Sequence, residues 1–199
     1  MKLGIVSDIH CNVDTFQRAL TEMAGRVDEV LVAGDAVFEY RMSNEVVELI
    51  REVGARYVLG NHEMVLMSSA GVRARAMPHV RQANLDVLAA TPERIDVTVD
   101  GKRLVMVHGS PFEPHREYLY RSSRTLRRVD ELGVDMLVLG HTHVPMAERF
   151  GRTLVINPGS IGDSRSSEPG RPVSYAVLDT GSEEVELVSF PSMPVEPAA

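Results

Sequence analysis

This chain of 199 residues contains a single cysteine, Cys11, so it cannot form an internal disulfide. A chain without disulfides is typical of a reducing compartment, which favours a cytoplasmic protein. No apolar stretch approaches the roughly 18 residues that a membrane helix needs. The apolar run after Met1 is too short for the core of a signal peptide. The sequence therefore predicts neither a membrane anchor nor secretion.

The chain also lacks the basic excess that a face for duplex nucleic acid would need. Lys and Arg total 21 against 28 Asp and Glu, which gives a formal net charge of −7. A phosphate substrate stays open, because bound cations can reverse the local field. There is no internal repeat and no low-complexity linker. We therefore predict one soluble domain over residues 1–190, followed by an irregular tail over residues 191–199.

Short apolar runs rich in β-branched residues recur along the chain, and each ends abruptly in polar residues. Continuous runs of this length suit strands that are buried on both faces. Helix-like segments lie between several of them, so the pattern predicts a mixed α/β fold with strands inside and helices outside. The runs are Leu3–Val6, Val30–Ala33, Tyr57–Leu59, Leu104–Val107 and Met136–Leu139.

Local signals predict four helices and two hairpins. Asn12 and Ser43 are candidate caps for the first two helices. The dipeptide Asp100-Gly101 favours a tight hairpin between Ile95–Val99 and Lys102–Val107. The second hairpin pairs Val173–Leu178 with Val185–Phe190. The predicted helices cover Val13–Gly25, Asn44–Val53, Pro78–Ala90 and Thr125–Leu132.

Potential metal ligands follow each of the five apolar runs. In open α/β sheets, ligands bind at the carboxyl ends of the strands. Alternate side chains of an extended strand point the same way, so the two outer residues of Asp-x-His or His-x-His can bind one ion together. A lone His or Gly-Asp is more often structural, but five such clusters at one sheet edge indicate a binding site. The clusters are Ser7-Asp8-Ile9-His10, Gly34-Asp35, Gly60-Asn61-His62, His108-Gly109-Ser110 and Gly140-His141-Thr142-His143.

The ligand types narrow the choice of metal. Imidazole, carboxylate and amide oxygen without thiolate suit Mn, Fe, Zn, Co or Ni. Seven ligands are too many for one tetrahedral zinc, but they suit two ions that share a carboxylate. The candidate ligands are Asp8, His10, Asp35, Asn61, His108, His141 and His143.

In order and type, the clusters resemble the five blocks of the calcineurin-like metallophosphoesterases, over residues 8 to 143. The segment Asn157-Pro158-Gly159-Ser160 resembles a late turn of the small bacterial members, the phosphodiesterase group. The resemblance implies a four-layer α/β/β/α sandwich of two mixed β-sheets flanked by helices. By resemblance, Asp8, His10 and His143 bind one divalent ion, Asn61, His108 and His141 bind the other, and Asp35 bridges them.

The implied reaction is hydrolysis of a small-molecule or nucleotide phosphate ester, most simply a phosphodiester. The implied nucleophile is a hydroxide shared by two ions, with Mn the first choice, roughly 3.5–4 Å apart. Besides Asp35, the implied catalytic residue is His62, whose protonated imidazole would donate to the leaving oxygen. Asn61, His62 and Asn12 are candidate substrate contacts, although Asn12 also suits a helix cap.

The sequence departs from the protein-phosphatase branch of the family. That branch has Asp-Arg-Gly shortly after the bridging Asp, whereas here Phe38 stands where the Asp that orients the catalytic His would be. The departure argues against a protein phosphatase and leaves the orientation of His62 unexplained. Arg41 or Arg165 are candidate phosphate contacts, with an ordinary surface role as the alternative, and Cys11 suits small-residue packing.

Three alternatives stay open at this stage. A phosphomonoesterase or a nucleotide pyrophosphatase would use the same centre, and a non-catalytic metal-binding scaffold would keep the fold without the reaction. Variable loops decide the substrate. The candidate lids are residues 38–42, 63–77 and 111–123. A homo-oligomer is compatible with the sequence, which does not specify the oligomeric state.

Overall fold

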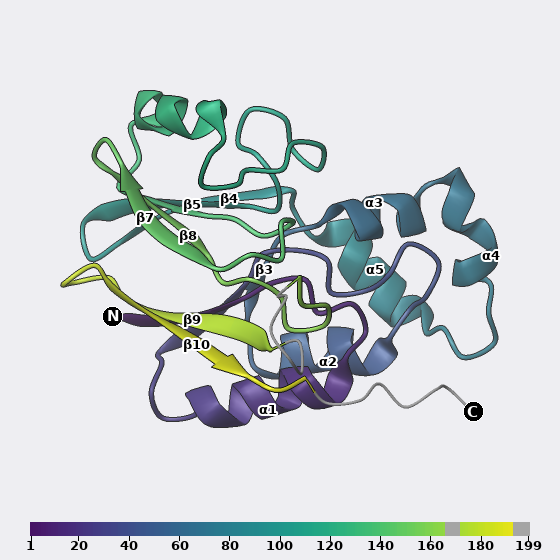
Figure 1. Ribbon diagram of the computed structural model, residues 1–199. Helices are drawn as coiled ribbons and strands as arrows, with labels where there is room; N and C mark the ends of the chain where they lie inside the picture. The colour runs from purple at the N-terminus through teal and green to yellow at the C-terminus, as the bar shows by residue number, and fades with distance from the viewer. Residues whose placement is uncertain (166–171, 193–199) are drawn as a thin grey trace.

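Two five-stranded mixed sheets lie face to face in the computed structural model, which describes residues 1–165 and 172–192 (Figure 1). The first sheet has the order β10-β9-β1-β2-β3, and the second has the order β4-β5-β6-β8-β7. The first sheet contains β1 (Lys2–Val6), β2 (Glu29–Val32), β3 (Arg56–Tyr57), β9 (Val173–Asp179) and β10 (Glu184–Phe190). The second contains β4 (Arg94–Val99), β5 (Lys102–Val107), β6 (Met136–Val138), β7 (Met146–Phe150) and β8 (Thr153–Asn157).

Helices cover the outer faces of both sheets. In Figure 1, α1 and α2 lie along the outer face of the first sheet, and the 3₁₀ helix η2 lies over the second. The four-layer sandwich that the sequence predicts is confirmed, with a 3₁₀ helix in its fourth layer. The helices are α1 (Val13–Met23), α2 (Asn44–Glu52), α3 (Asn61–Met67), η1 (Ser69–Gly71), α4 (Val72–Arg75), α5 (Gln82–Ala90) and η2 (Arg124–Leu132).

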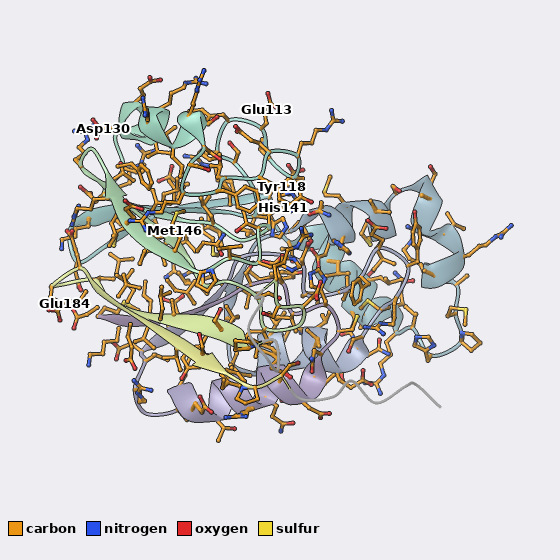
Figure 2. The ribbon with its side chains drawn as sticks, in the orientation of Figure 1. Glu113, Tyr118, Asp130, His141, Met146 and Glu184 are labelled. Carbon is orange, nitrogen blue, oxygen red and sulfur yellow. The ribbon has the colours of Figure 1, made fainter. Side chains whose placement is uncertain are left out.

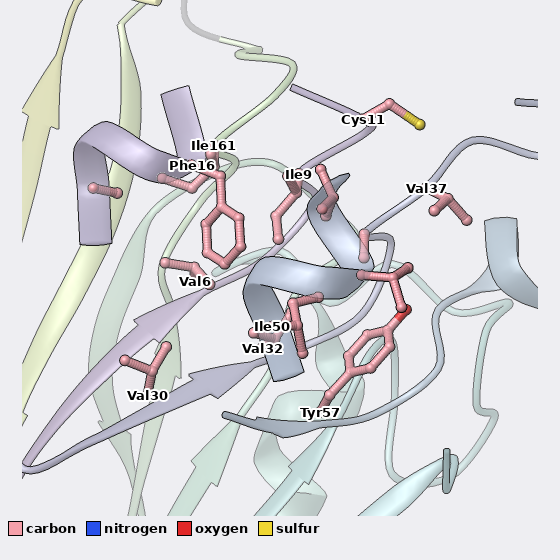
Figure 3. Packing of buried hydrophobic residues seen from close by; sticks show 14 of the residues in the cluster. Val6, Ile9, Cys11, Phe16, Val30, Val32, Val37, Ile50, Tyr57 and Ile161 are labelled. Carbon is pink, nitrogen blue, oxygen red and sulfur yellow. The ribbon is translucent and has the colours of Figure 1, made fainter. Parts of the chain in front are cut away.

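Three hydrophobic clusters fill the spaces between the four layers, which explains why the strand sequences are apolar without alternation. On β5, Leu104 and Met106 pack between the sheets, whereas Val105 and Val107 pack under η2. The third cluster joins the first sheet to α1 and α2, and Figure 3 shows Phe16 inserted there. Since successive side chains point to opposite faces, a strand covered on both sides needs apolar residues at every position.

Several local predictions are confirmed. The side chain of Asn12 accepts a hydrogen bond from the Thr15 N–H at the start of α1, and Ser43 caps α2 in the same way. Asp100 and Gly101 both adopt positive φ, 49° and 77°, as a tight turn between β4 and β5 requires. Both predicted hairpins are antiparallel pairs.

Other local predictions are wrong. The helix predicted from Pro78 begins only at Gln82, because the Asn44 side chain donates to the His79 carbonyl and accepts from the Arg81 N–H, so helical bonds do not form there. The segment 63–77 is mostly helical, and its role as a lid stays a prediction. The hairpin of β7 and β8 is additional to those predicted. The expected tail over 191–199 lies almost wholly outside the described residues. None of the described helices has the length and apolar character needed to cross a membrane.

Candidate metal centre

All seven predicted ligands lie at one edge of the sandwich. Asp8, Asp35 and Asn61 follow β1, β2 and β3, which run parallel, while His108 and the 141–143 turn follow the parallel strands β5 and β6. Parallel strands present their carboxyl ends on the same side. The first sheet therefore supplies four of the candidate ligands, and the second sheet supplies three.

The ligands sit on turns and not on extended strand, which corrects the expected geometry. Positive φ angles occur at Asp8 (53°), His10 (51°), His141 (68°) and His143 (59°). Such left-handed backbone is costly for residues other than Gly, by about 1–3 kcal/mol each. Hydrogen bonds across the sheet edge hold it in place: the N–H groups of Asp8 and His10 donate to the carbonyls of Gly34 and Asp35, each at 3.0 Å. Strain at these positions makes them candidates for a functional site.

The first group of ligand atoms comprises Asp8, His10 and His143. Asp8 Oδ1 lies 3.2 Å from His143 Nε2 and 3.8 Å from His10 Nε2, and the two Nε2 atoms are 3.2 Å apart. His143 Nδ1 donates to the Asp163 carbonyl at 2.6 Å. In the neutral ring this bond leaves the Nε2 lone pair free for a metal, the arrangement typical of ligating histidines.

The second group comprises Asp35, His108 and His141, with Asn61 beside them. His108 Nε2 lies 3.1 Å from both Asp35 Oδ2 and Asn61 Oδ1, and its Nδ1 donates to the Ala33 carbonyl at 2.7 Å. Asp35 also belongs to a third group with His10 and His62, whose ligand atoms all lie within 4.8 Å of one another. Asp35 therefore stands between the two ligand sets.

The pKa values of several side chains in the site differ strongly from their ordinary values. Burial disfavours the charged form of His108, but the carboxylates of Asp35 and Asp8 outweigh it and raise the pKa of His108 to about 10. Burial dominates at His10 and His141 and lowers both pKa values to about 4. Burial would raise the pKa of Asp35, but His108 more than offsets this and keeps it well below its ordinary value. Near neutral pH the site thus offers neutral His10 and His141 and an ionised Asp35.

The nitrogen and oxygen atoms of these side chains do not satisfy one another by hydrogen bonds, whereas divalent cations would satisfy them. Two ring nitrogens face each other at 3.2 Å in the first group, and His141 Nε2 is buried without a hydrogen-bond partner among the described residues. Buried polar atoms normally find partners, so a missing bond indicates an ion or water. The donor set of imidazole, carboxylate and amide suits a transition metal.

His62 lies at the edge of this centre, in the first turn of α3 and not on the extended segment that we expected. Its Nδ1 accepts a hydrogen bond from the Glu39 N–H at 3.2 Å, and its Nε2 lies 3.7 Å from Asp35 Oδ2. Phe38 stacks on His10 at 4.6 Å and meets the His62 ring edge-on at 5.4 Å. The Glu39 N–H and the Phe38 ring thus orient the His62 ring.

Two further predicted contacts lie close by. Arg41 reaches over the Phe38 ring at 4.8 Å and donates to the His10 carbonyl at 3.0 Å, whereas Arg165 is exposed. Asn12 uses Oδ1 for its cap, and its Nδ2 is buried with no hydrogen-bond partner in the described part of the chain. Cys11 is buried as expected, and burial raises the pKa of its thiol.

Two residues of the site were not anticipated. Glu63 is buried and accepts hydrogen bonds from the N–H groups of Asp35, Val37 and Gly60, at 3.0, 3.0 and 2.7 Å. As the third residue of α3 it accepts from the N–H of the cap residue Gly60, which is the glutamate half of a capping box; glycine lacks the side chain that would complete the sequence signal. Tyr118 stacks on His141 with ring centroids 3.7 Å apart, and Figure 2 labels the two residues next to each other. Nothing in the local sequence predicts that contact.

Comparison with known proteins agrees with this geometry. The sequence model described as "Calcineurin-like phosphoesterase superfamily domain" matches residues 1–183. Phosphodiesterase YfcE of Escherichia coli is 29% identical over 90% of this chain and 88% of its own length. A metallophosphoesterase from Sphaerobacter thermophilus superposes with a TM-score of 0.74 at 26% identity, covering 97% of this chain and 90% of that one. The YfcE structure, at 24% identity, covers 95% of this chain and 99% of its own, with a TM-score of 0.57, and shows the shared fold.

Proposed function

The chain belongs to the calcineurin-like phosphoesterase superfamily and is a hydrolase of phosphoric esters, and from this premise we propose that it is a phosphodiesterase with two divalent metal ions. The observation that carries the proposal is the position of Asp35 between two clusters of buried donors. Asp8, His10 and His143 would hold one ion, Asn61, His108 and His141 the other, and Asp35 both. We take Mn as the first metal to test, with Fe, Zn, Co and Ni as alternatives.

Two such ions, when bound, supply an activated water and neutralise charge on the phosphate. The residues of the chain do the rest. Asp8 and Asp35 contribute −2 against +4 from two divalent ions, so the occupied site keeps a net positive charge that attracts a phosphate anion. Phe38, in place of the Asp of protein phosphatases, supports a small ester over a phosphoprotein as the substrate. The E. coli relative, a phosphodiesterase by name, supports a diester.

Activity assays with metal analysis test the proposal directly. Purified protein reconstituted with Mn should bind about two ions per chain and hydrolyse bis-p-nitrophenyl phosphate faster than p-nitrophenyl phosphate. The reverse preference would indicate a monoesterase. Binding of metal without hydrolysis of diesters, monoesters or nucleotide pyrophosphates would indicate a scaffold. Absence of metal and of activation by any divalent ion would overturn the proposal.

The substitution Asp35→Asn tests whether Asp35 binds both metal ions. Because a bridging carboxylate neutralises two ions at once, this substitution should weaken both sites, each by more than about 100-fold, the upper range for residues that only orient a ligand. His10→Ala should chiefly weaken one site. Calorimetric titration with Mn²⁺ measures both, and His79→Ala, at an exposed histidine, is the control. If Asp35→Asn binds two ions with wild-type affinity, Asp35 is not the bridge.

The compartment and the oligomeric state stay predictions. A reducing, cytoplasmic compartment follows from the single cysteine. A homo-oligomer would be tested by sedimentation of the Mn-loaded protein.

A further inference from the structure

An exposed tyrosine covers one of the candidate metal ligands. The rings of Tyr118 and His141 are 3.7 Å apart between centroids and inclined by only 22° (Figure 2). His141 is 5% exposed, whereas Tyr118 keeps 43% of its surface accessible. The tyrosine comes from the loop between β5 and η2, and its ring lies against that of His141. A substrate held at the ions therefore has an aromatic surface beside it.

A second tyrosine extends this surface. The rings of Tyr118 and Tyr120 are nearly parallel, at 8°, with centroids 6.2 Å apart, and Tyr120 is 38% exposed. Between them, Leu119 is buried in the cluster under η2 and anchors the loop. Ser123 holds the backbone of Tyr120 in place, because its hydroxyl accepts a hydrogen bond from the Tyr120 N–H and its own N–H donates to the Tyr120 carbonyl. The loop thus presents two rings outward from a fixed backbone.

A cavity of about 440 Å³ opens beside the second ring. Its lining includes Tyr120, Thr142 and Met146, and Thr142 lies between the candidate ligands His141 and His143. Cavities that bind small ligands commonly measure about 300–1,000 Å³ and have mostly apolar walls. The cavity therefore adjoins the metal-binding turn and has room for a planar heterocycle.

We propose that Tyr118 and Tyr120 form a stacking platform for a nucleobase, so that the substrates are phosphate esters of nucleosides. The proposal rests on the proposed function, because the phosphate must be held at the metal centre for the base to lie here. Every base has a flat π-face, and stacking on an aromatic side chain contributes binding without hydrogen-bond readout. An aliphatic ester would gain little from two exposed phenol rings. The platform therefore sets the class of substrate and leaves the identity of the base unspecified.

Two phosphates that differ only in the base test the platform. AMP and ribose 5-phosphate are titrated into Mn-loaded protein by calorimetry, and AMP should bind about tenfold more tightly, within the range measured for base stacking. If either ester is hydrolysed, the ratio of KM values replaces the ratio of Kd values. Tyr118→Ala and Tyr120→Ala should each reduce the preference for AMP at least threefold, and Tyr118→Phe should keep it. Val53→Ala, at an exposed apolar side chain after α2, should also keep it.

The outcomes separate the platform from a purely structural role. If Tyr118 only shields His141, Tyr118→Ala will weaken Mn²⁺ binding and weaken both phosphates equally, and the proposal is wrong. Equal affinity of the wild-type protein for AMP and ribose 5-phosphate also overturns it. Failure of both phosphates to bind in a metal-dependent way would instead contradict the proposed phosphoesterase centre.

Discussion

The Glu39 backbone and the Phe38 ring contact the His62 ring, and the Asp35 carboxylate lies beside its Nε2. The Glu39 N–H donates to Nδ1, so in the neutral ring the hydrogen lies on Nε2, the nitrogen that faces Asp35. A carboxylate in place of this N–H would require the hydrogen on Nδ1. The contact therefore selects the tautomer in which Nε2 is a donor, and a leaving oxygen at the metal centre would receive its hydrogen bond.

His62→Ala should retain both metals and lose about 10²–10⁴-fold in rate on a diester with a poor leaving group. The loss should be much smaller on bis-p-nitrophenyl phosphate, because nitrophenolate leaves without a proton. Steady-state kinetics on both esters, with metal analysis, measure the difference, and His79→Ala is the control. Equal losses on both esters would assign His62 to phosphate binding and not to leaving-group donation.

At the scale of elements, the turn from β3 into α3 fixes the position of Asp35. Glu63 in α3 accepts hydrogen bonds from three backbone N–H groups, two in the loop after β2 and one at Gly60. Gly60 lies so close to Asp35 that a Cβ atom at position 60 would come within 2.4 Å of the Asp35 backbone nitrogen. Helix α3 and the loop after β2 are therefore packed as one unit at the metal centre.

Gly60→Ala should push Asp35 out of place. Overpacking of this kind costs about 1–3 kcal/mol of stability, and Mn²⁺ affinity should fall at least about tenfold, as for loss of a residue that orients a ligand. Thermal unfolding and calorimetry measure the two effects. Gly25→Ala is the comparison, since a Cβ there meets no atom within 4 Å although φ is +71°. That variant should lose stability through backbone strain and bind Mn²⁺ normally; a normal Mn²⁺ affinity for Gly60→Ala would show that Asp35 does not depend on this contact.

Some of the helices, strands and turns could be predicted from the sequence, and others could not. Strands buried on both faces have continuous apolar sequences, so β1, β2, β5 and β6 were predictable, as were the caps Asn12 and Ser43. The helix start at Gln82 depends on Asn44, which is distant in sequence, so no local signal predicts it. The candidate ligands were predictable from their types and order along the chain. Their left-handed turns depend on bonds between loops after β1 and β2, which a local pattern does not contain.

At the scale of the whole molecule, metal binding should be coupled to protonation and to stability. His108 has its pKa raised to about 10, so it carries a proton at neutral pH that a metal ion must displace. A raised pKa means that this proton stabilises the metal-free fold fully below about pH 6.5, the ordinary pKa of His, and that this contribution is lost as pH rises towards 10. Metal binding therefore competes with a stabilising proton.

Mn²⁺ affinity should rise by about tenfold per pH unit between pH 6.5 and 8.5 for each proton displaced. The increase in melting temperature on adding Mn²⁺ to chelator-treated protein should be larger at pH 8.5 than at pH 6.5, since stabilisation grows with the ratio of ligand concentration to Kd. Calorimetry in buffers of different ionisation enthalpy counts the protons released. An affinity that does not change with pH would mean that His108 is already neutral before the metal binds.

The division of the ligands between the two sheets sets an order of events during synthesis. The first group needs Asp8 and His10 from the start of the chain and His143 from beyond its middle, and the second group needs Asn61 together with His108 and His141. A nascent chain emerging from the ribosome therefore completes neither group until residue 141 has been made. In the proposed metal centre, the two ions would therefore reach their full ligand sets late, after His141 and His143 have joined the donors of the first sheet.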